Sequence, residues 1–317
     1  MFEKLAEKIK KAEKIAIFNH EHPDGDALGS AYALKLALMS LGKRAEVFMR
    51  GGDDQSVEYS LVSGSEPTGL EISDCDLKIA VDCAELARIG DISGLFTGNT
   101  ACIDHHRTHI EFSDTTVVVA DAPATGEIIY DLIRYMNITL TRGIANNLYI
   151  AIVCDTGNFK YASTSPKTMR TAAALMETGI DTAEISRKIF DTKTMEYLRL
   201  YAKSIDKLEI YGGGKIALLA LTDEDFAAAG IDESAADGVV TLPRRVEGAD
   251  VGVYIRQRGE NEYKVSLRSN AETDVSAVAQ KFGGGGHVRA SGLTLKMPLD
   301  EAKRTIVKAI EEVMAVQ

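Results

Sequence analysis

One short motif near the N-terminus constrains this chain more than any other feature. The sequence His-x-x-Pro-Asp-x-Asp, from His20 to Asp26, follows directly after an apolar run at residues 15–18. Neighbouring carboxylates such as Asp24 and Asp26 repel each other and lose hydration when a fold brings them together. A bound divalent cation removes that cost. The motif therefore predicts a metal site whose remaining ligands come from elsewhere in the chain.

The apolar pattern of the first half predicts a parallel, doubly wound α/β sheet. Short buried-type strands alternate with helical patterns, an order typical of this fold class. In such sheets ligands bind beyond the carboxyl ends of the strands. The predicted strands are residues 15–18, 45–48, 77–82, 100–103 and 117–119, with a Gly-Gly turn at Gly51-Gly52, and the predicted helices are residues 27–41, 125–136, 142–153, 167–178 and 182–190, after a first helix that runs up to Lys14.

The pattern changes after a long polar-apolar helix at residues 193–207. Strand patterns follow, then a glycine run at residues 283–286 and a closing helix at residues 299–313. We predict an N-terminal domain that carries the metal motif, a linker helix and a smaller C-terminal domain with a mixed sheet. The predicted bounds are residues 1–190, 191–207 and 208–317, with C-terminal strands at residues 215–221, 251–256 and 263–268 and from Leu293.

Composition excludes several classes of protein. A net charge of −11 argues against a protein that coats nucleic acid non-specifically. It does not exclude a small phosphorylated substrate, because metal ions and local arginines reverse the sign inside a site. We see no secretory signal and no apolar run of membrane-spanning length. The four cysteines form no C-x-x-C pair, so we expect a cytoplasmic protein with reduced thiols.

Further ligand-type residues follow the predicted strands. Asp82 ends the third strand, Asp104-His105-His106 leave the fourth, and Asp155 ends a helix. Side chains alternate along an extended backbone, so at most one of His105 and His106 faces a given metal. The plausible ligands supply two nitrogens and four carboxylates: His20, Asp24, Asp26, Asp82, His105 and Asp155.

This donor set is too large for one tetrahedral zinc ion. It suits two octahedral or five-coordinate ions that share a bridging carboxylate. Two such ions about 3.5–4 Å apart activate water and stabilise an in-line phosphoryl transition state. The mixed nitrogen and oxygen ligands favour Mn²⁺, with Mg²⁺, Co²⁺ and Zn²⁺ as alternatives.

The second half carries groups suited to phosphate. Four consecutive glycines before His287 allow backbone N–H groups to converge on an anion, although a glycine run by itself also suits a flexible loop. Arg268-Ser269-Asn270 combines a guanidinium, a hydroxyl and an amide. Most other arginines here suit a solvated face. We regard Arg289 and the Arg244-Arg245 pair as secondary candidates.

The metal-ligand motifs of the first half of the chain resemble those of the DHH phosphoesterase superfamily, both in their order and in their spacing. The C-terminal motifs resemble the DHH-associated domain of its RecJ-like and NrnA-type branch. The resemblance implies one Mn²⁺ on His20, Asp24 and Asp82, and a second on Asp26, Asp82, His105 and Asp155, with Mg²⁺ or Co²⁺ as substitutes. It further implies that His106 contacts the scissile phosphate and helps to protonate the leaving oxygen. His22 departs from the family pattern, and we expect neither His22 nor Asp104 to be a ligand, with Asp104 orienting a neighbour. The resemblance also implies that the first domain is catalytic and the second binds substrate, with the active site in the cleft between them. The implied substrate-binding residues are Arg268, Ser269, Asn270, Gly284, Gly285, Gly286 and His287.

The resemblance implies a phosphohydrolase that uses two-metal activation of water. Its substrates would be short RNA or DNA oligonucleotides and 3′-phosphoadenosine 5′-phosphate, as for a 3′-to-5′ oligoribonuclease or bisphosphate nucleotidase. A cyclic- or linear-dinucleotide phosphodiesterase remains a rival, and a non-catalytic nucleotide-binding protein is another. A pyrophosphatase or polyphosphatase fits the second domain less well. The preferred substrate, the polarity of degradation, the metal used in the cell and the oligomeric state, including a homodimer, stay open.

Overall fold

The computed structural model describes residues 1–49, 56–236 and 238–316. The predicted turn at Gly51-Gly52 lies outside these residues. The chain divides into two compact units, Met1–Thr192 and Lys193–Gln317, each described here by itself.

The N-terminal unit is built on a parallel sheet, as predicted, which has five strands among the described residues. The strand order is β2-β1-β3-β4-β5. The chain leaves β1 toward β2 on one side and returns to β3 on the other, so β1 and β3 flank a topological switch point. The strands are β1 Lys14–Phe18, β2 Arg44–Phe48, β3 Leu77–Val81, β4 Thr100–Asp104 and β5 Thr116–Val118.

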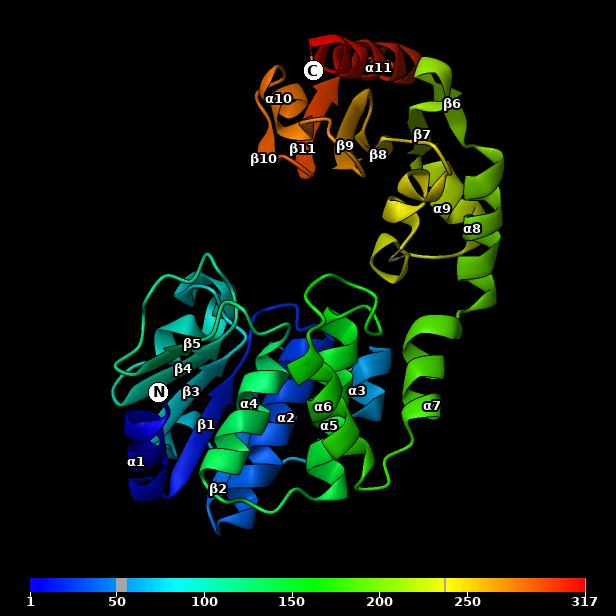
Figure 1. Ribbon diagram of the computed structural model, residues 1–317. Coiled ribbons are helices and arrows are strands. Elements are labelled where there is room, and N and C mark those ends of the chain that lie inside the picture. The colour runs from blue at the N-terminus through cyan, green and yellow to red at the C-terminus, as the bar shows by residue number, and fades with distance from the viewer. Residues whose placement is uncertain (50–55, 237, 317) are drawn as a thin grey trace. The chain divides into compact units, whose positions relative to one another are not determined.

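Helices cover one face of this sheet. Figure 1 shows α2, α4 and α5 side by side, and all three contact one another. Asp24 begins α2 by accepting the backbone N–H groups of Asp26 and Ala27, which is a standard helix N-cap. The helices of this unit are α1 Glu3–Lys11, α2 Gly25–Ser40, α3 Val57–Leu61, α4 Thr125–Tyr135, α5 Arg142–Asp155, α6 Pro166–Met176 and α7 Thr182–Ser186, after which the chain makes a π-helical turn at Arg187–Asp191.

Strand alternation separates the core of this unit into two clusters. Ile15 and Ile17 of β1 belong to the large cluster under the helices. Ala16 and Phe18 point to the other face, where they pack with Phe96 and its neighbours. That second face is covered by 3₁₀ segments, Ile72–Asp74 and Leu86–Leu95, rather than by α-helices.

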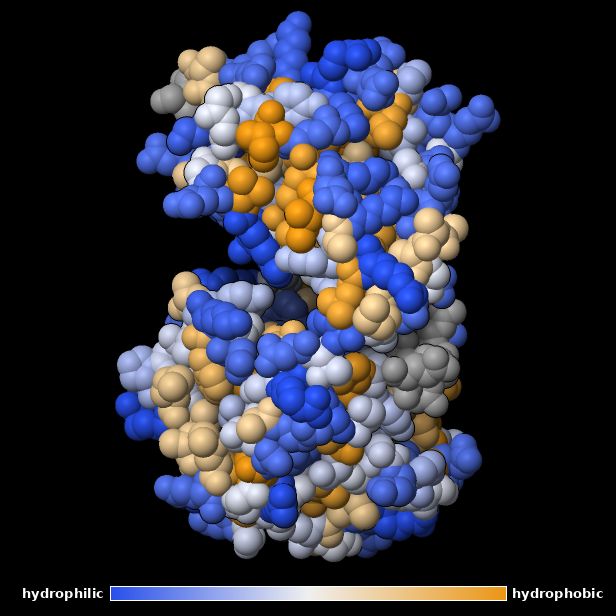
Figure 2. Space-filling model, turned by 90° about the vertical axis from the view of Figure 1, so that its right-hand side faces the viewer, coloured by the Kyte–Doolittle hydropathy of each residue, from blue (hydrophilic) through white to orange (hydrophobic). Residues whose placement is uncertain are grey.

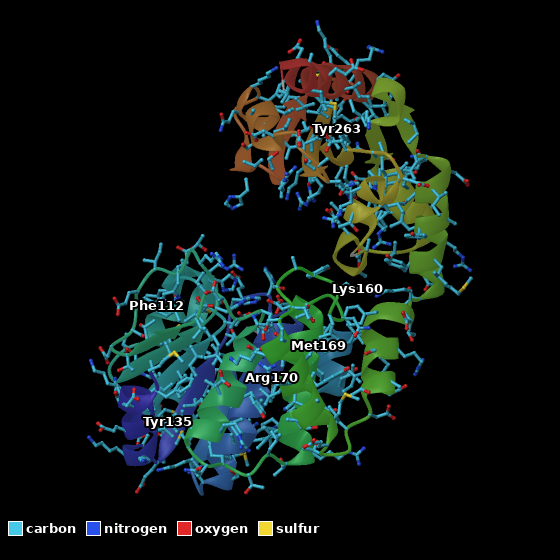
Figure 3. The ribbon with its side chains drawn as sticks, viewed as in Figure 1. Phe112, Tyr135, Lys160, Met169, Arg170 and Tyr263 are labelled. Atoms are coloured by element: carbon cyan, nitrogen blue, oxygen red, sulfur yellow. The ribbon has the colours of Figure 1, made fainter. Side chains whose placement is uncertain are left out.

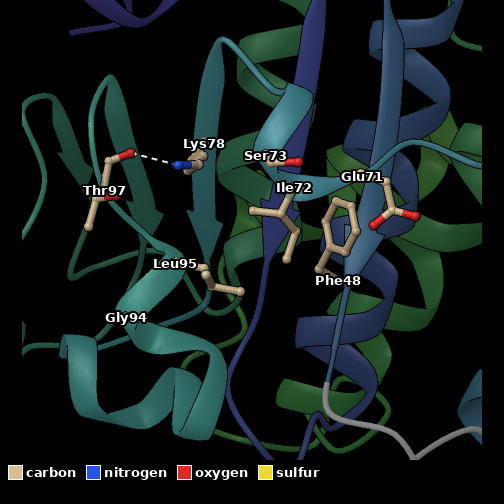
Figure 4. A pocket seen from close by; sticks show the side chains of 8 residues that line it. All are labelled: Phe48, Glu71, Ile72, Ser73, Lys78, Gly94, Leu95 and Thr97. Carbon is tan, nitrogen blue, oxygen red and sulfur yellow. Dashed lines mark hydrogen bonds between the residues drawn. The ribbon is translucent and has the colours of Figure 1, made fainter.

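A pocket of about 430 Å³ lies on this second side of the unit. Figure 4 shows it beside the 3₁₀ segments, with the Lys78 ammonium donating a hydrogen bond to the carbonyl of Thr97. Its lining combines apolar side chains with one carboxylate and one ammonium group: Phe48, Glu71, Ile72, Ser73, Lys78, Gly94, Leu95 and Thr97. It contains none of the predicted metal ligands.

The C-terminal unit contains a mixed sheet, also as predicted, with the order β10-β11-β9-β8-β7-β6. β7 and β8 are parallel, and the other pairs are antiparallel. The strands are β6 Glu209–Tyr211, β7 Ile216–Leu221, β8 Val251–Gly259, β9 Glu262–Ser269, β10 Gly285–His287 and β11 Ala290–Lys296.

Helices pack on both faces of this second sheet. Leu218 of β7 lies in the cluster formed with α10 and α11, whereas Leu219 lies in the cluster formed with α8 and α9. Burial on both faces explains why β7 is a continuous apolar run. The helices are α8 Met195–Asp206, α9 Asp223–Ala229, α10 Val275–Gln280 and α11 Leu299–Val316.

The predicted elements differ from the observed ones at a few places. The first helix ends at Lys11, because Ala12 is already extended. The short α9 was not predicted, although Thr222 and Asp225 form a capping box at its start. The segment predicted as one helix at residues 182–190 changes from α- to π-helical geometry after Ser186. Part of the glycine run is strand β10 rather than loop.

Several apolar side chains of α8 are exposed, among them Met195, Leu198 and Ile205. Figure 2 shows apolar residues between hydrophilic ones on this side of the C-terminal unit.

Within the described part of the chain, no helix has both the length and the apolar character that a membrane span requires.

Candidate metal centre

The loop after β1 brings an imidazole to two carboxylates. His20 is buried, with its Nε2 atom 4.0 Å from Asp24 Oδ1 and 3.6 Å from Asp82 Oδ2. Because the Asp24 carboxylate also caps α2, its position is fixed by the helix that follows it. One potential ligand atom from each of His20, Asp24 and Asp82 lies within 4.8 Å of the others. These three side chains could hold a metal ion.

Asp26 lies in the first turn of α2 and is fully buried. Its Oδ1 atom accepts hydrogen bonds from the Ser30 hydroxyl and the Gly126 N–H, both at 3.0 Å. Its Oδ2 atom accepts the Thr125 N–H at 2.7 Å. The two N–H groups belong to the first turn of α4, where the helix dipole favours negative charge. Burial nevertheless raises the pKa of Asp26 well above its usual value, and the charge of Asp82 adds to this rise.

Asp82 occupies the middle of the site. It directly follows β3 with a φ of 57°, a left-handed conformation that aspartate tolerates better than most residues. Its Oδ2 faces His20, and its Oδ1 lies 3.5 Å from Nε2 of His105. The Thr125 hydroxyl donates a hydrogen bond of 3.0 Å to Oδ1. The two carboxylate oxygens therefore point toward two different imidazoles.

His105 completes a second group of ligand-type atoms. Its Nε2 lies 3.2 Å from Asp155 Oδ2 and 3.8 Å from Asp26 Oδ2. Its Nδ1 lies 3.2 Å from the carbonyl of Ala122, and a carbonyl only accepts, so Nδ1 is the donor. In the neutral tautomer that carries this proton, Nε2 has the lone pair through which histidine binds metals. Asp26, His105 and Asp155 could hold a metal ion.

His106 lies beside this group with a different partner. Its Nδ1 is 2.7 Å from Oδ1 of Asp104 and 3.8 Å from Oδ1 of Asp82. Asp82, His105 and His106 thus form a third set with ligand atoms within 4.8 Å. The hydrogen bond to Asp104 raises the pKa of His106, and the nearby charge of Asp82 acts in the same direction against partial burial.

Asp155 is held at the end of α5 by an unusual turn. Gly157, Asn158 and Phe159 all have positive φ, at 55°, 59° and 64°. A Cβ atom on Gly157 would lie 2.4 Å from the ring of Tyr161, so another residue at this positive φ would strain the turn or displace that ring. Burial raises the pKa of Asp155 to about 7, with further contributions from Asp24 and Asp82. Figure 3 labels Lys160 on the loop that continues from this turn.

The donor set fits divalent metal. The carboxylates of Asp26 and Asp155 are crowded and partly or fully buried, which is unfavourable unless a proton or a cation neutralises them. The predicted ligands converge in two groups. One is His20, Asp24 and Asp82, and the other is Asp26, His105 and Asp155. Asp82 faces the histidine of each group. His22, the other histidine of the loop, is exposed. These acidic and histidine groups could therefore bind metal.

Several supporting groups were not anticipated from the sequence. Thr125 and Gly126 hold Asp26 through backbone N–H groups, which residue identity does not reveal. Ser30 and the carbonyl of Ala122 likewise orient ligand-type side chains. The only available signal was the Thr-Gly pair at the start of a predicted helix, a usual place for anion binding.

In the C-terminal unit the predicted phosphate-binding residues meet at one end of the sheet. Arg268 of β9 pairs with Gly252 of β8 and with Ala290 of β11, which pairs with His287 of β10. Residues directly opposite in a sheet project to the same face, and neighbouring strands lie about 4.8 Å apart. Arg268 and His287 therefore flank the small side chain of Ala290.

Two further predicted residues brace this end of the sheet. The Asn270 amide donates hydrogen bonds to the carbonyls of Arg244 and Ala249, so it holds the Arg244-Arg245 turn. The Ser269 hydroxyl accepts a hydrogen bond from the Arg289 guanidinium at 3.1 Å.

The glycine run joins β11 rather than forming an open loop. A Cβ atom on Gly284 would lie 2.3 Å from the carbonyl oxygen of Gly292, and one on Gly286 would lie 2.5 Å from that of Ala290. Close approach between the strands thus explains these glycines, while Gly285 has open space around it. Arg256 and Arg258 are paired with Glu233 instead of facing this end of the sheet.

A parallel sheet with a histidine- and aspartate-rich edge at its switch point, followed by a mixed-sheet domain, defines a class of two-domain phosphoesterases. The chain belongs to the DHH family. The family model "DHH family, N-terminal domain" matches residues 14–152, and the "DHHA1 domain" model matches residues 213–316.

Relatives cover almost the whole chain. It is 35% identical over 316 residues to the bifunctional oligoribonuclease and PAP phosphatase NrnA of Thermus thermophilus, a match that covers 97% of this chain and 93% of that protein. It is 27% identical to the cyclic-di-AMP phosphodiesterase PdeA of Listeria monocytogenes, covering 97% of this chain and 49% of that protein.

A solved structure agrees over a similar length. The crystal structure of an exopolyphosphatase-related protein from Bacteroides fragilis matches with a TM-score of 0.82 and 26% identity. The match covers 98% of this chain and 95% of that one. The predicted family and fold class are thereby confirmed.

Proposed function

We propose that this protein is a Mn²⁺-dependent phosphohydrolase that degrades short oligoribonucleotides and dephosphorylates 3′-phosphoadenosine 5′-phosphate. The observation that carries the proposal is the position of Asp82, whose two oxygens face His20 on one side and His105 on the other. The 35% identity to an oligoribonuclease and PAP phosphatase supports the choice of substrates.

Six side chains would hold two ions. His20, Asp24 and Asp82 would bind one, and Asp26, Asp82, His105 and Asp155 the other, with Asp82 shared. Mn²⁺ suits this mixture of imidazole and carboxylate ligands, and Mg²⁺ or Co²⁺ could substitute. When bound, such ions lower the pKa of water and neutralise charge on a phosphoryl group.

His106 would act on the leaving group. Its Nδ1 donates to Asp104, so in the imidazolium form the second proton is at Nε2. The hydrogen bond to Asp104 raises the pKa of His106, which favours the protonated form of the ring. Nε2 would donate its proton to the oxygen that departs from phosphorus, as general acid catalysis requires.

The C-terminal unit would bind the remaining phosphates of the substrate. Arg268 and His287 project from one face of its sheet, with Ala290 between them. Guanidinium groups bind phosphate oxygens through paired hydrogen bonds. Within this scheme the predicted division into a catalytic domain, a linker helix and a substrate-binding domain is part of the proposal. The full set of proposed substrate-binding residues is Arg268, Ser269, Asn270, Gly284, Gly285, Gly286 and His287.

The test is a hydrolysis assay with Mn²⁺ across di- to pentaribonucleotides, 3′-phosphoadenosine 5′-phosphate, cyclic dinucleotides and pyrophosphate. We expect turnover of the short oligonucleotides and the bisphosphate, and almost none in an Asp155→Asn variant. Nucleotide binding without turnover would instead indicate a sensor. Turnover confined to pyrophosphate would contradict the proposal.

A dinucleotide phosphodiesterase is the second candidate. The 27% identity to a cyclic-di-AMP phosphodiesterase over 97% of this chain favours it. Preferential cleavage of cyclic over linear dinucleotides in the same assay would establish it.

A further inference from the structure

His109 is the one histidine of the 105–109 segment to which the proposed reaction assigns no role. It lies in a tight turn after β4, in which its backbone N–H donates to the carbonyl of His106 at 3.2 Å. The turn brings the His109 imidazole back over Asp104, and Nδ1 lies 2.7 Å from Asp104 Oδ2. The His109 side chain is only 7% exposed and packs against Phe112, with the ring centres 5.6 Å apart.

Asp104 joins the two imidazoles. It is fully buried, and its Oδ1 accepts hydrogen bonds from His106 Nδ1 at 2.7 Å and from the His105 backbone N–H at 2.9 Å. Among the described residues, His109 is the one hydrogen-bond donor to Oδ2 of Asp104. Hydrogen bonds from His106 and His109 lower the pKa of Asp104 despite its burial. An ionised carboxylate only accepts, so both Nδ1 atoms donate.

The other ring nitrogen of His109 indicates how this histidine is protonated. Its Nε2 atom is buried and has no hydrogen-bond partner within the described part of the chain. A second proton there would create a buried charged donor without an acceptor, which is costly. His109 therefore presents its Nδ1–H to Asp104. The other imidazole partner of this carboxylate is His106, whose side chain is 37% exposed.

We propose that His109 is a positioning residue for the hydrolytic reaction. By holding Oδ2 it fixes the plane of the Asp104 carboxylate, so that Oδ1 meets His106 Nδ1 and the opposite nitrogen of His106 is aimed at the leaving oxygen. The inference depends on the proposed function only because it assumes that the protein hydrolyses a phosphate ester. The hydrogen-bonded chain from His109 through Asp104 to His106 exists without substrate.

The kinetic test compares three variants in the full-length protein with Mn²⁺. His109→Leu removes the donor, and His109→Asn keeps an N–H donor near the same place. Phe112→Leu alters the packing of the His109 ring without touching Asp104. We expect kcat to fall about 10- to 100-fold in His109→Leu, the size usual for residues that orient the side chains of a metal site. KM and the metal content should stay near wild type, His109→Asn should recover most of kcat, and Phe112→Leu should match wild type.

Two kinetic outcomes would overturn the inference. One is a wild-type kcat in His109→Leu. The other is an equal loss of kcat in His109→Leu, His109→Asn and Phe112→Leu, which would indicate packing alone.

A second readout separates this inference from the proposed function. Nitrogen-proton NMR of the full-length protein with diamagnetic Mg²⁺ should show His109 protonated at Nδ1 and not at Nε2. The Nδ1 proton of His106 should shift in His109→Leu but not in Phe112→Leu. If no nucleotide is hydrolysed but these signals are seen, the proposed function fails while the positioning contact stands. A His109 protonated at Nε2 instead would overturn the inference even in an active enzyme.

Discussion

Nε2 of His105 lies 3.2 Å from Oδ2 of Asp155, which joins the loop after β4 to the last residue of α5. The two residues are far apart in sequence, and each comes from the end of a regular element. Asp82 faces the same imidazole from the end of β3. The edge of the sheet thus concentrates negative charge that the protein alone does not neutralise, and the first prediction follows from that charge.

Without metal, the free energy of unfolding should fall as the pH rises from about 4 to about 7. The pKa of Asp155 is raised to about 7, so in this range the folded protein holds a proton that the unfolded chain has released. Each such proton contributes a slope of about −1.4 kcal/mol per pH unit. Denaturant unfolding in the presence of a chelator measures it, and Asp155→Asn should show a shallower fall. A slope equal in both proteins would contradict this assignment.

Gly157→Ala should reduce both stability and activity. The substitution combines a φ of 55° with a Cβ placed 2.4 Å from the Tyr161 ring, so the turn that holds Asp155 is strained and either this turn or the ring must shift. Gly179→Ala is the matched control, because its φ is 80° but nothing lies within 4 Å of the added Cβ. We expect the control to lose about 1 kcal/mol and to keep its activity. Equal effects in the two variants on melting temperature and kcat would contradict the close-packing argument.

Lys35→Met should lower the free energy of unfolding of the N-terminal unit. The Lys35 ammonium is 1% exposed and donates hydrogen bonds of 2.8 Å to Glu46 Oε1 and to the carbonyl of Glu66. Removing one partner of a buried pair leaves the other charge uncompensated, at a cost of about 3–5 kcal/mol. Lys281→Met, which breaks an exposed pair with Glu312, should change the unfolding midpoint little. Similar midpoints for the two variants would contradict the prediction.

Arg268→Ala should raise KM for oligonucleotides about tenfold and leave kcat nearly unchanged, since it removes binding that ground and transition states share. Arg258→Ala provides the control, because Arg258 is already paired with Glu233 through both terminal nitrogens. Steady-state kinetics on a trinucleotide measures both constants. A wild-type KM in Arg268→Ala would show that other residues bind the substrate.

The candidate ligands could be selected from the sequence because they cluster where predicted strands and one predicted helix end. Strand ends at the same edge of a parallel sheet converge, so the proximity of Asp82 and His105 followed from topology alone. The fold class was predictable for the same reason, as alternating apolar runs and helices leave few arrangements.

What the sequence did not reveal depends on backbone geometry. The N–H groups of Thr125 and Gly126 bind Asp26 whatever side chains they carry. The residue type of Asp82 permits a left-handed φ but does not predict one. The glycine run could serve a loop or a close strand pair, and only the register with β11 distinguishes them. His109 could not be separated from its neighbours, because its contact to Asp104 depends on a tight turn.

The central claim is that Asp82 is shared by two metal ions, and counting Mn²⁺ bound per chain by equilibrium dialysis tests it most directly. Asp82→Asn is the informative variant, because asparagine tolerates the left-handed backbone of Asp82 and keeps an amide in place of the charge. We predict two Mn²⁺ per wild-type chain and a large loss of affinity at both sites in Asp82→Asn, with the fold retained. A single Mn²⁺ in the wild type, or two retained at unchanged affinity in Asp82→Asn, would contradict the account.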